Sequence, residues 1–282
     1  MSAITGARSS IVRSAFVHII LIVYTIIALT PAIVVLVNSF KSRRAIFGSP
    51  MSLPTPDTFS LIGYQRVFER GNFLLYFENS VIVTLVSLAL IIVFGAMAAF
   101  ALSEYEFRGH RALGLYLVLG VMIPIRLGTV GIVKLMASAG LSDTLTALIL
   151  VYTAQGLPLA IYILAEFMRG VSADLKSAAR IDGLSEYSIL FFVVMPLIRP
   201  AIATIVVFTM IPIWNDLWFP LVLAPGERTR TITIGAQSFV GQFLTDWNAV
   251  LAALSLAILP VLVLYLAFSR QLIRGLTAGA VK

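Results

Sequence analysis

The sequence contains no cysteine and only two histidines among its 282 residues. Without cysteine the chain forms no disulfide bond and has neither a thiol nucleophile nor a thiolate metal ligand. The histidines, His18 and His110, are far apart in the sequence, and neither stands in a cluster with the spacing of metal ligands. Thiol enzymes and cysteine-rich metal domains are therefore excluded, and no metal site is predicted.

Charged residues are scarce as well: they make up 12% of the chain, whereas 60% of its residues are hydrophobic. Soluble domains average about 25% charged and about 45–50% apolar residues. A soluble globule of this size with an unusually apolar core is the alternative, but it has too few charged side chains to cover its water-facing surface. The composition therefore predicts that most of the chain is dissolved in lipid.

Acidic residues are fewer than basic ones, 13 against 20, and the formal net charge is +7. A basic balance is typical of nucleic-acid-binding proteins, and also of membrane proteins with Lys and Arg in their cytoplasmic loops. No basic and aromatic surface module stands outside the apolar segments of this sequence. We therefore expect membrane lipid as a partner and no nucleic acid.

The apolar residues gather in runs long enough to cross a bilayer, which takes roughly 20 residues in a helix. Six such segments lie at about 15–37, 80–102, 113–135, 145–168, 198–223 and 249–268. The first is longer than the apolar core of a signal peptide, and we interpret it as a retained span. The fold class predicted is an all-α integral membrane protein with about six transmembrane helices, in which 15–269 is the transmembrane domain.

An even number of spans places both termini on one side of the membrane. Lys and Arg are more frequent in the segments on that side than in the opposite loops, which predicts that the terminal segments 1–14 and 270–282 are cytoplasmic. The basic cluster Lys41, Arg43 and Arg44 opposes this orientation, but its loop is long, and charges in long loops count less. Residues 59–80 within and after this outer loop are predicted to form an amphipathic helix at the outer interface.

Residues 169–200, between the fourth and fifth spans, form a loop too apolar and too helix-prone for a flexible connection. Ser172 suits an N-cap, and Asp174 would then lie in the first turn, where a negative charge favours the helix dipole. Gly183 suits the left-handed residue that ends a helix. Ser185 is placed to cap a second helix, so two short helices are predicted to meet at a glycine.

Pro196 and Pro200 are predicted to end the second helix before the fifth span begins. Two short helices joined by a tight bend form a rigid projection on the cytoplasmic side. Such a projection can fit a groove on a soluble partner and transmit movement to the spans. It can equally be a hairpin that lies on the membrane without a partner, and local pattern leaves both interpretations open.

The stretch SAARIDG, followed after a spacer by MPLIRP, resembles the EAA loop of ABC-importer permeases. That pattern is E-A-A, three residues, Gly, then about ten residues and a hydrophobic-Pro pair. Ala178, Ala179, Gly183 and Pro196 match it. Ser177 stands where the family usually has Glu, and this is a departure from the pattern.

The usual Glu is described as pairing with a basic residue of the ATPase, and the resemblance does not carry that contact over to Ser177. Asp174 and Asp182 are the nearby carboxylates able to take its place. The segments YEFRGHR, WNDLWFPLVL, TDWNAVLAALSLAILPVLVL and RGLTAGAVK add to the resemblance, which covers most of 80–282. They are similar to the carbohydrate-uptake branch of these permeases, and in particular to the maltose-type second permease subunit.

The resemblance implies a non-catalytic subunit of a bacterial inner-membrane importer of a sugar, oligosaccharide or sugar derivative. A second related permease would supply the other half of the pathway, and a solute-binding protein would deliver the substrate from outside. Two copies of an ATPase subunit would bind ATP and Mg and dock on the 172–195 loop. The chain itself would bind no cofactor, and it has no G-x-x-x-x-G-K-[ST] phosphate loop. In the family the tail reaches between the ATPases, which here involves Gly275, Thr277, Ala278 and Gly279.

Polar residues inside the predicted spans are further candidates, because ionisable groups in a bilayer usually face a cavity or a partner. Arg126 lies in the third span, and Asn215 and Asp216 lie in the fifth. Three interpretations are open: Arg126 and Asp216 pair within the permease; Arg126 faces the pathway and attracts an anionic sugar derivative; or the third span is broken at Pro124, so that Arg126 and Lys134 lie at the outer interface.

Rival classes make different demands on the sequence. An ion-coupled secondary carrier predicts inverted repeats and several midplane carboxylates, whereas no repeat is evident and Asp216 alone lies deep in a span. A membrane enzyme requires a cluster of catalytic residues, and none is present. The nearest alternative is an ABC permease for a phosphorylated or sulfonated polyol.

Overall fold

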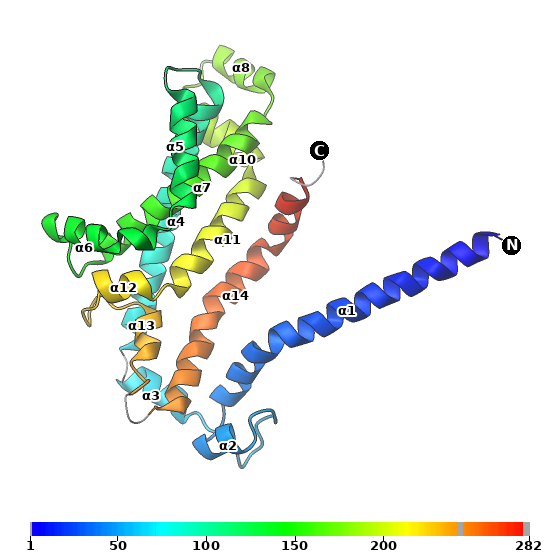
Figure 1. Ribbon diagram of the computed structural model, residues 1–282, viewed down its shortest axis with the longest axis vertical. Coiled ribbons are helices and arrows are strands. Elements are labelled where there is room, and N and C mark those ends of the chain that lie inside the picture. Colours follow the sequence, from blue (N-terminus) through cyan, green and yellow to red (C-terminus); the bar gives the residue numbers. More distant parts are fainter. Residues whose placement is uncertain (1, 71, 242–244, 279–282) are drawn as a thin grey trace. The chain divides into compact units, whose positions relative to one another are not determined.

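The computed structural model describes residues 2–70, 72–241 and 245–278, and within these it is helical apart from short loops and two isolated β-bridges (Figure 1). Four helices are long and apolar enough to cross a membrane, and two bent helix pairs bring the number to six if each pair is one span. The four are α1 (Ser2–Ser39), α4 (Phe73–Glu104), α7 (Leu145–Arg169) and α14 (Trp247–Ala278). The predicted all-α membrane fold is confirmed.

The chain divides into two compact units, and the first comprises Met1–Gly71 and Ala236–Leu256. It contains α1, α2 (Arg43–Gly48), α3 (Ile62–Arg70) and the beginning of α14. The Asn248 amide donates to the Lys41 carbonyl at 2.7 Å, and Arg66 forms a salt bridge to Asp246 at 2.8 Å. These contacts tie the loop that follows α1 to the start of α14. The amphipathic helix predicted over 59–80 is shorter than expected, because α3 ends before Asn72, which is left-handed with a φ of 42°.

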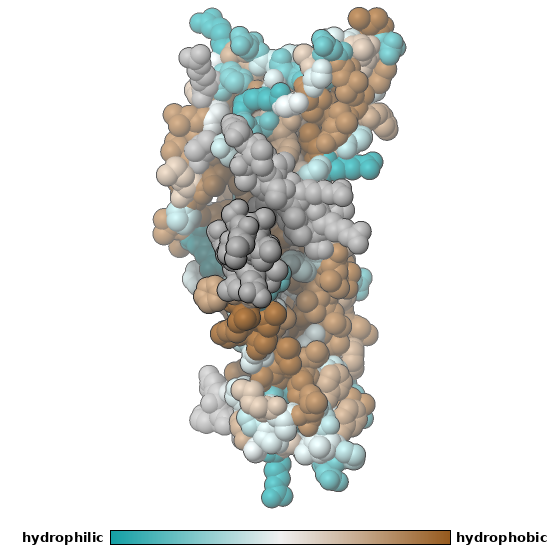
Figure 2. Space-filling view, turned by 90° about the vertical axis from the view of Figure 1, so that its right-hand side faces the viewer, coloured by the Kyte–Doolittle hydropathy of each residue, from teal (hydrophilic) through white to brown (hydrophobic). Residues whose placement is uncertain are grey.

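The second unit comprises Asn72–Gly235 and Ala257–Lys282, and its core is formed mainly by α4 and α7. Small residues let these two helices approach closely, as they often do in membranes. A Cβ placed on Gly95 would lie only 3.2 Å from that of Ala160. Apolar side chains also cover much of the surface in Figure 2, while hydrophilic ones gather at the bottom and at the top, the end where Figure 1 labels α8. An exposed apolar surface of this kind suits lipid or a membrane partner.

The third predicted span is not a continuous helix. Its pieces are α5 (His110–Met122), the 3₁₀ turn η1 (Ile125–Gly128) and α6 (Thr129–Ser138). The two arms on either side of the break meet at 87°. Proline disfavours a helical conformation in the residue before it, and Ile123, which precedes Pro124, is extended with a ψ of 118°. The predicted segment 113–135 is therefore present as a bent helix pair, and the predicted break at Pro124 is confirmed.

The fifth predicted span is interrupted in the same way. It consists of α11 (Arg199–Asn215) and α12 (Trp218–Leu223), and Asp216 between them is extended. The short helix α13 (Ile232–Gln237) follows after a loop. The sixth predicted span corresponds to α14, which continues to Ala278, beyond the predicted end of the span at 268. Gly275, Thr277 and Ala278 of the predicted tail lie in its last turns, and Gly279 lies outside the described residues.

The predicted loop between the fourth and fifth spans does contain two short helical segments. They are α8 (Ala173–Ile181) and a second segment made of α9 (Glu186–Ser188), one π-helical turn η2 (Ile189–Val194) and α10 (Met195–Leu197). Gly183 is left-handed with a φ of 82°, and the Ser185 hydroxyl accepts from the Ser188 amide at 3.2 Å, so both predictions are confirmed. Ser172 occupies the N-cap position, but its side chain makes no capping bond, so that prediction was wrong.

The second segment meets α11 at an angle of 82°, and two prolines lie at this bend. Pro196 cannot donate a backbone hydrogen bond, and in a regular helix its ring would clash with the carbonyl four residues earlier. The wider π turn η2 lies immediately before it. Pro200 lies in the first turn of α11, where a missing N–H costs nothing. The bend therefore falls between the two prolines, and Pro196 lies inside the segment that it was expected to end.

Candidate functional site

Most of the predicted docking residues are exposed, and those within α8, at positions 174, 177 and 178, lie on one side of that helix. Those exposed are Asp174, Ser177, Ala178, Asp182, Gly183 and Pro196. Ala179 is buried, because a residue two positions after Ser177 points to the opposite side of a helix with 3.6 residues per turn. Ile181 is 87% exposed and adds a large apolar side chain to the same side. The arrangement is a small apolar surface with carboxylates at its edge.

The opposite side of α8 carries a buried cation that sequence reasoning missed. Lys176 is only 6% exposed, and its ammonium group forms an ion pair with the carboxylate of Glu104, the last residue of α4. The second carboxylate oxygen of Glu104 lies 3.4 Å from Nη2 of Arg180, in the last turn of α8. A single carboxylate from α4 thus contacts both basic residues of α8, the buried Lys176 and the exposed Arg180.

Arg180 continues these contacts to the second helical segment. Its Nε and Nη2 donate to the two carboxylate oxygens of Glu186 at 2.7 and 3.0 Å. The hydrogen bonds to Glu186 raise the pKa of Arg180 further above its ordinary value, with a smaller contribution from Glu104. Glu104, Lys176, Arg180 and Glu186 form what we call the ion-pair cluster. Two acidic and two basic groups balance within it.

A second buried carboxylate lies where the fifth span breaks. Asp216, whose side chain is 6% exposed, accepts from Nη2 of Arg126 at 3.0 Å and from the hydroxyl of Tyr152 at 2.9 Å. It also accepts from the backbone N–H groups of Trp218 and Phe219 at 3.2 and 3.1 Å. The last two bonds cap the start of α12, so the carboxylate joins α12 to α7 and to the break after α5.

The structure therefore brings Arg126 and Asp216 together, and it also breaks the third span at Pro124. The pairing of Arg126 with Asp216 is confirmed, and so is the break, whereas the placement of Arg126 and Lys134 at the outer interface stays a prediction. The Arg126 side chain remains 65% exposed. Asn215 is exposed, and its amide donates to the Ile211 carbonyl at 2.9 Å. Lys134 is exposed on α6.

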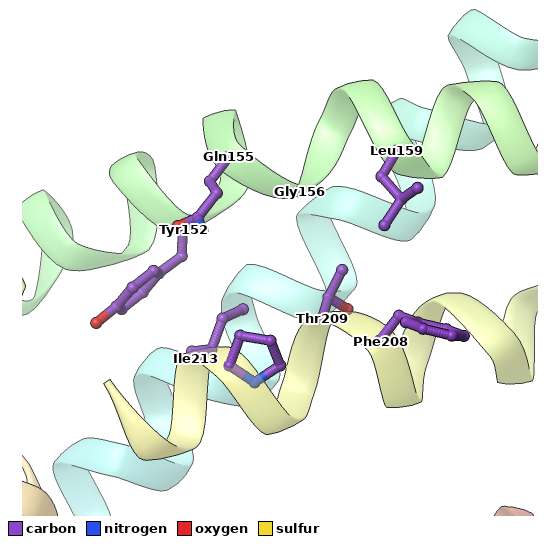
Figure 3. Close-up of a pocket in the computed structure, with 8 residues that line it drawn as sticks. Tyr152, Gln155, Gly156, Leu159, Phe208, Thr209 and Ile213 are labelled. Carbon is purple, nitrogen blue, oxygen red and sulfur yellow. The ribbon is translucent and has the colours of Figure 1, made fainter. Parts of the chain in front are cut away.

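A cavity of about 100 Å³ opens between α7 and α11 (Figure 3). Its lining side chains come from one helix on each side, and the polar ones are Tyr152, Gln155 and Thr209. Thr209 uses its hydroxyl to donate to the Ile205 carbonyl at 2.6 Å. Small-molecule sites usually enclose about 300–1,000 Å³, so this cavity does not enclose a sugar by itself. Among the residues that the structure describes, no group of three His, Asp or Glu is placed to hold a metal ion.

Comparisons with known proteins agree with this architecture. The family model described as "binding-protein-dependent transport system inner membrane component" matches residues 2–277. A putative ABC transporter permease protein of Caldicellulosiruptor sp. is 36% identical over 94% of this chain and 95% of its own length. The diacetylchitobiose uptake system permease protein of Streptomyces coelicolor is 32% identical over 94% of this chain and 88% of its own.

One solved structure shares the fold over nearly the whole chain. It is a chain of a bacterial ABC transporter involved in the import of the acidic polysaccharide alginate, with a TM-score of 0.79 and 22% identity. The match covers 93% of this chain and 97% of that one. The family model and both relatives span almost the entire sequence. The chain therefore belongs to the family of inner-membrane components of binding-protein-dependent transport systems, and it is a multi-pass permease subunit.

Proposed function

We propose that this chain is one of two related permease subunits in an ATP-driven importer of a sugar, an oligosaccharide or a neutral sugar derivative. A solute-binding protein delivers the substrate, and two ATPase subunits supply the energy. The observation that carries the proposal is the exposed side of α8 on a chain that matches the family over residues 2–277. The diacetylchitobiose uptake permease among the relatives supports a carbohydrate as the substrate class.

The exposed side of α8 is the proposed docking surface for an ATPase subunit. Ala178 and Ile181 present apolar contact area, and Asp174 and Asp182 lie at its edge. Ser177 lies on this surface in place of the usual Glu, so we assign the charged contact to the two aspartates. On this assignment α8, both termini and the C-terminal tail are cytoplasmic. The tail residues Gly275, Thr277, Ala278 and Gly279 then approach the ATPases.

The site at Asp216 supports a neutral rather than an anionic substrate. Arg126 is paired with that carboxylate at 3.0 Å, so its charge is already neutralised locally. An anionic sugar would have to compete with an aspartate that is fixed by three further donors. The small cavity between α7 and α11 also supports a shared pathway, because a second permease is needed to enclose a sugar.

The test is a pull-down of the tagged chain, expressed from its native locus and solubilised in detergent, with bound proteins identified by mass spectrometry. We expect an ATPase subunit, a second permease and a solute-binding protein. Ala178→Arg should remove the ATPase but keep the second permease, because it places a bulky charge on the docking surface. Lys134→Ala on α6 is the matched control and should keep all partners. Recovery of the chain alone, beside a control importer that stays assembled, would contradict the proposal.

A further inference from the structure

We infer that the ion pair between Glu104 and Lys176 is a positioning element that fixes the docking helix α8 to the end of α4. The inference rests on the proposed function, since α8 is taken as the surface that the ATPase contacts. It adds residues that the docking motif does not include. The role is to hold the orientation of α8, so that α8 and α4 move together during transport.

The first observation is the burial of both partners. The side chains of Glu104 and Lys176 are 9% and 7% exposed, although both residues lie beside an exposed loop and helix. Removing charges from water is costly, and the cost is offset only where the partner and the geometry are in place. A buried pair therefore disfavours other placements of α8, in which either charge would be left without its partner.

The second observation is that the same carboxylate controls both helical segments of the loop. Glu104 binds Lys176 with one oxygen and approaches Arg180 with the other, at 3.4 Å. Arg180 in turn holds Glu186 through two hydrogen bonds, at 2.7 and 3.0 Å. Arg180 thus joins α8 to α9, and Glu104 joins α8 to α4, so the loop is held to α4 as one piece.

The third observation concerns what α4 touches. It packs along α7, with Gly95 against Ala160 and Gly156 against Ile91. α7 in turn carries Tyr152, which donates to Asp216 at the break before α12. Force applied to α8 therefore reaches the central helix pair through Glu104. The covalent connection of α8 to α7 transmits force less directly, because residues 170–172 between these helices are not helical.

Distances between spin labels test the positioning directly, because the chain has no cysteine of its own. Phe94→Cys on α4 and Ser177→Cys on α8 are both at exposed sites. In the full-length chain in nanodiscs we expect one narrow distance distribution. Lys176→Met should broaden or shift this distance distribution. Lys176→Arg, which keeps the positive charge, should leave the distribution as narrow as in the unaltered chain. Arg169→Gln, which removes an exposed ion pair to Glu166 at 3.0 Å, is the matched control and should leave it unchanged.

The double variant Glu104→Gln/Lys176→Met guards against misfolding, because it leaves neither member of the pair as an uncompensated buried charge. It should fold and still show the broadened distribution. In the co-purified complex, stimulation of ATP hydrolysis by the co-purified binding protein should fall at least about fivefold, the lower end of coupling effects between sites, while the ATPase stays bound. Unchanged label distances in the double variant would overturn the inference. Absence of any ATPase from the unaltered complex would instead refute the proposed function, and the label distances would still decide the positioning.

Discussion

Two buried carboxylates, Glu104 and Asp216, each take a cation from a distant part of the chain, but they depend on it to different degrees. Glu104 is bound by Lys176 and Arg180, and Lys176 is as deeply buried as its partner. Asp216 is bound by one cation and three neutral donors, and that cation, Arg126, is 65% exposed. The comparison teaches that Glu104 requires its cation for stability, whereas Asp216 is satisfied largely without it.

The largest effect is expected at Lys176. Lys176→Met leaves Glu104 buried with only the longer contact to Arg180, and breaking one side of a buried pair costs about 3–5 kcal/mol. We expect the free energy of unfolding in mixed micelles to fall by about 3 kcal/mol, at the lower end because Arg180 remains. A loss of less than about 1 kcal/mol, the contribution of an exposed pair, would show that Glu104 depends on its cation no more than Asp216 does. Adding Glu104→Gln should recover part of the loss.

An intermediate effect is expected at Tyr152. Tyr152→Phe keeps the ring that packs edge-on against Phe219, with centroids 6.1 Å apart, and removes only the hydroxyl that donates to Asp216. Leaving a buried acceptor short of one donor costs about 1–3 kcal/mol. The unfolding titration should therefore show a loss in that range, larger than the loss at Arg126. Equal losses at Tyr152 and Arg126 would mean that the neutral donors do not stabilise the Asp216 carboxylate more than its cation does.

A small effect is expected at Arg126. Arg126→Gln removes a cation that is mostly exposed, and exposed pairs contribute about 0–1 kcal/mol. The free energy of unfolding should fall by less than about 1 kcal/mol, and uptake of a neutral sugar by cells should be unchanged. Selective loss of uptake for an acidic sugar would show that Arg126 contacts the substrate, contrary to the proposed neutral class.

The smallest effect is expected at Arg169, whose pair with Glu166 joins two exposed side chains three residues apart on α7. Such pairs add about 0.2–0.5 kcal/mol at most. Arg169→Gln should leave the unfolding midpoint within error of the unaltered protein. A loss comparable to that of Lys176→Met would indicate that charge alone, and not burial, sets the difference between the pairs.

The apolar segments could be predicted, because the length of an apolar run depends only on local composition, and the structure has four to six candidate spans. The breaks were harder to place. Pro124 was a local signal for the third span, and the structure breaks there. At Asp216 the local signal was weaker, and its bonds to Tyr152 and Arg126 could not be predicted, because these residues are 64 and 90 positions away in the sequence.

The docking loop was predicted well where its signals are local, as at Gly183 and Ser185. The ion-pair cluster was not predicted, because Glu104 and Lys176 are 72 positions apart and no local pattern joins them. A partial signal was present. Lys176 lies on the same side of α8 as Ala179, opposite the exposed Ser177, and a lone cation on the inner side of an amphipathic helix calls for a carboxylate.

The break at Asp216 also bears on how the protein is made. Lipid offers no partner to free backbone N–H groups, so an interrupted helix at membrane depth must bring its own acceptors. The two carboxylate oxygens of Asp216 accept from the N–H groups of Trp218 and Phe219, two and three residues further along the chain. Arg126 and Tyr152 precede it in the sequence, and chains emerge from the ribosome N-terminus first. The residues that supply the cation and the hydroxyl group to Asp216 are therefore synthesised before it, and the two backbone donors follow within three residues.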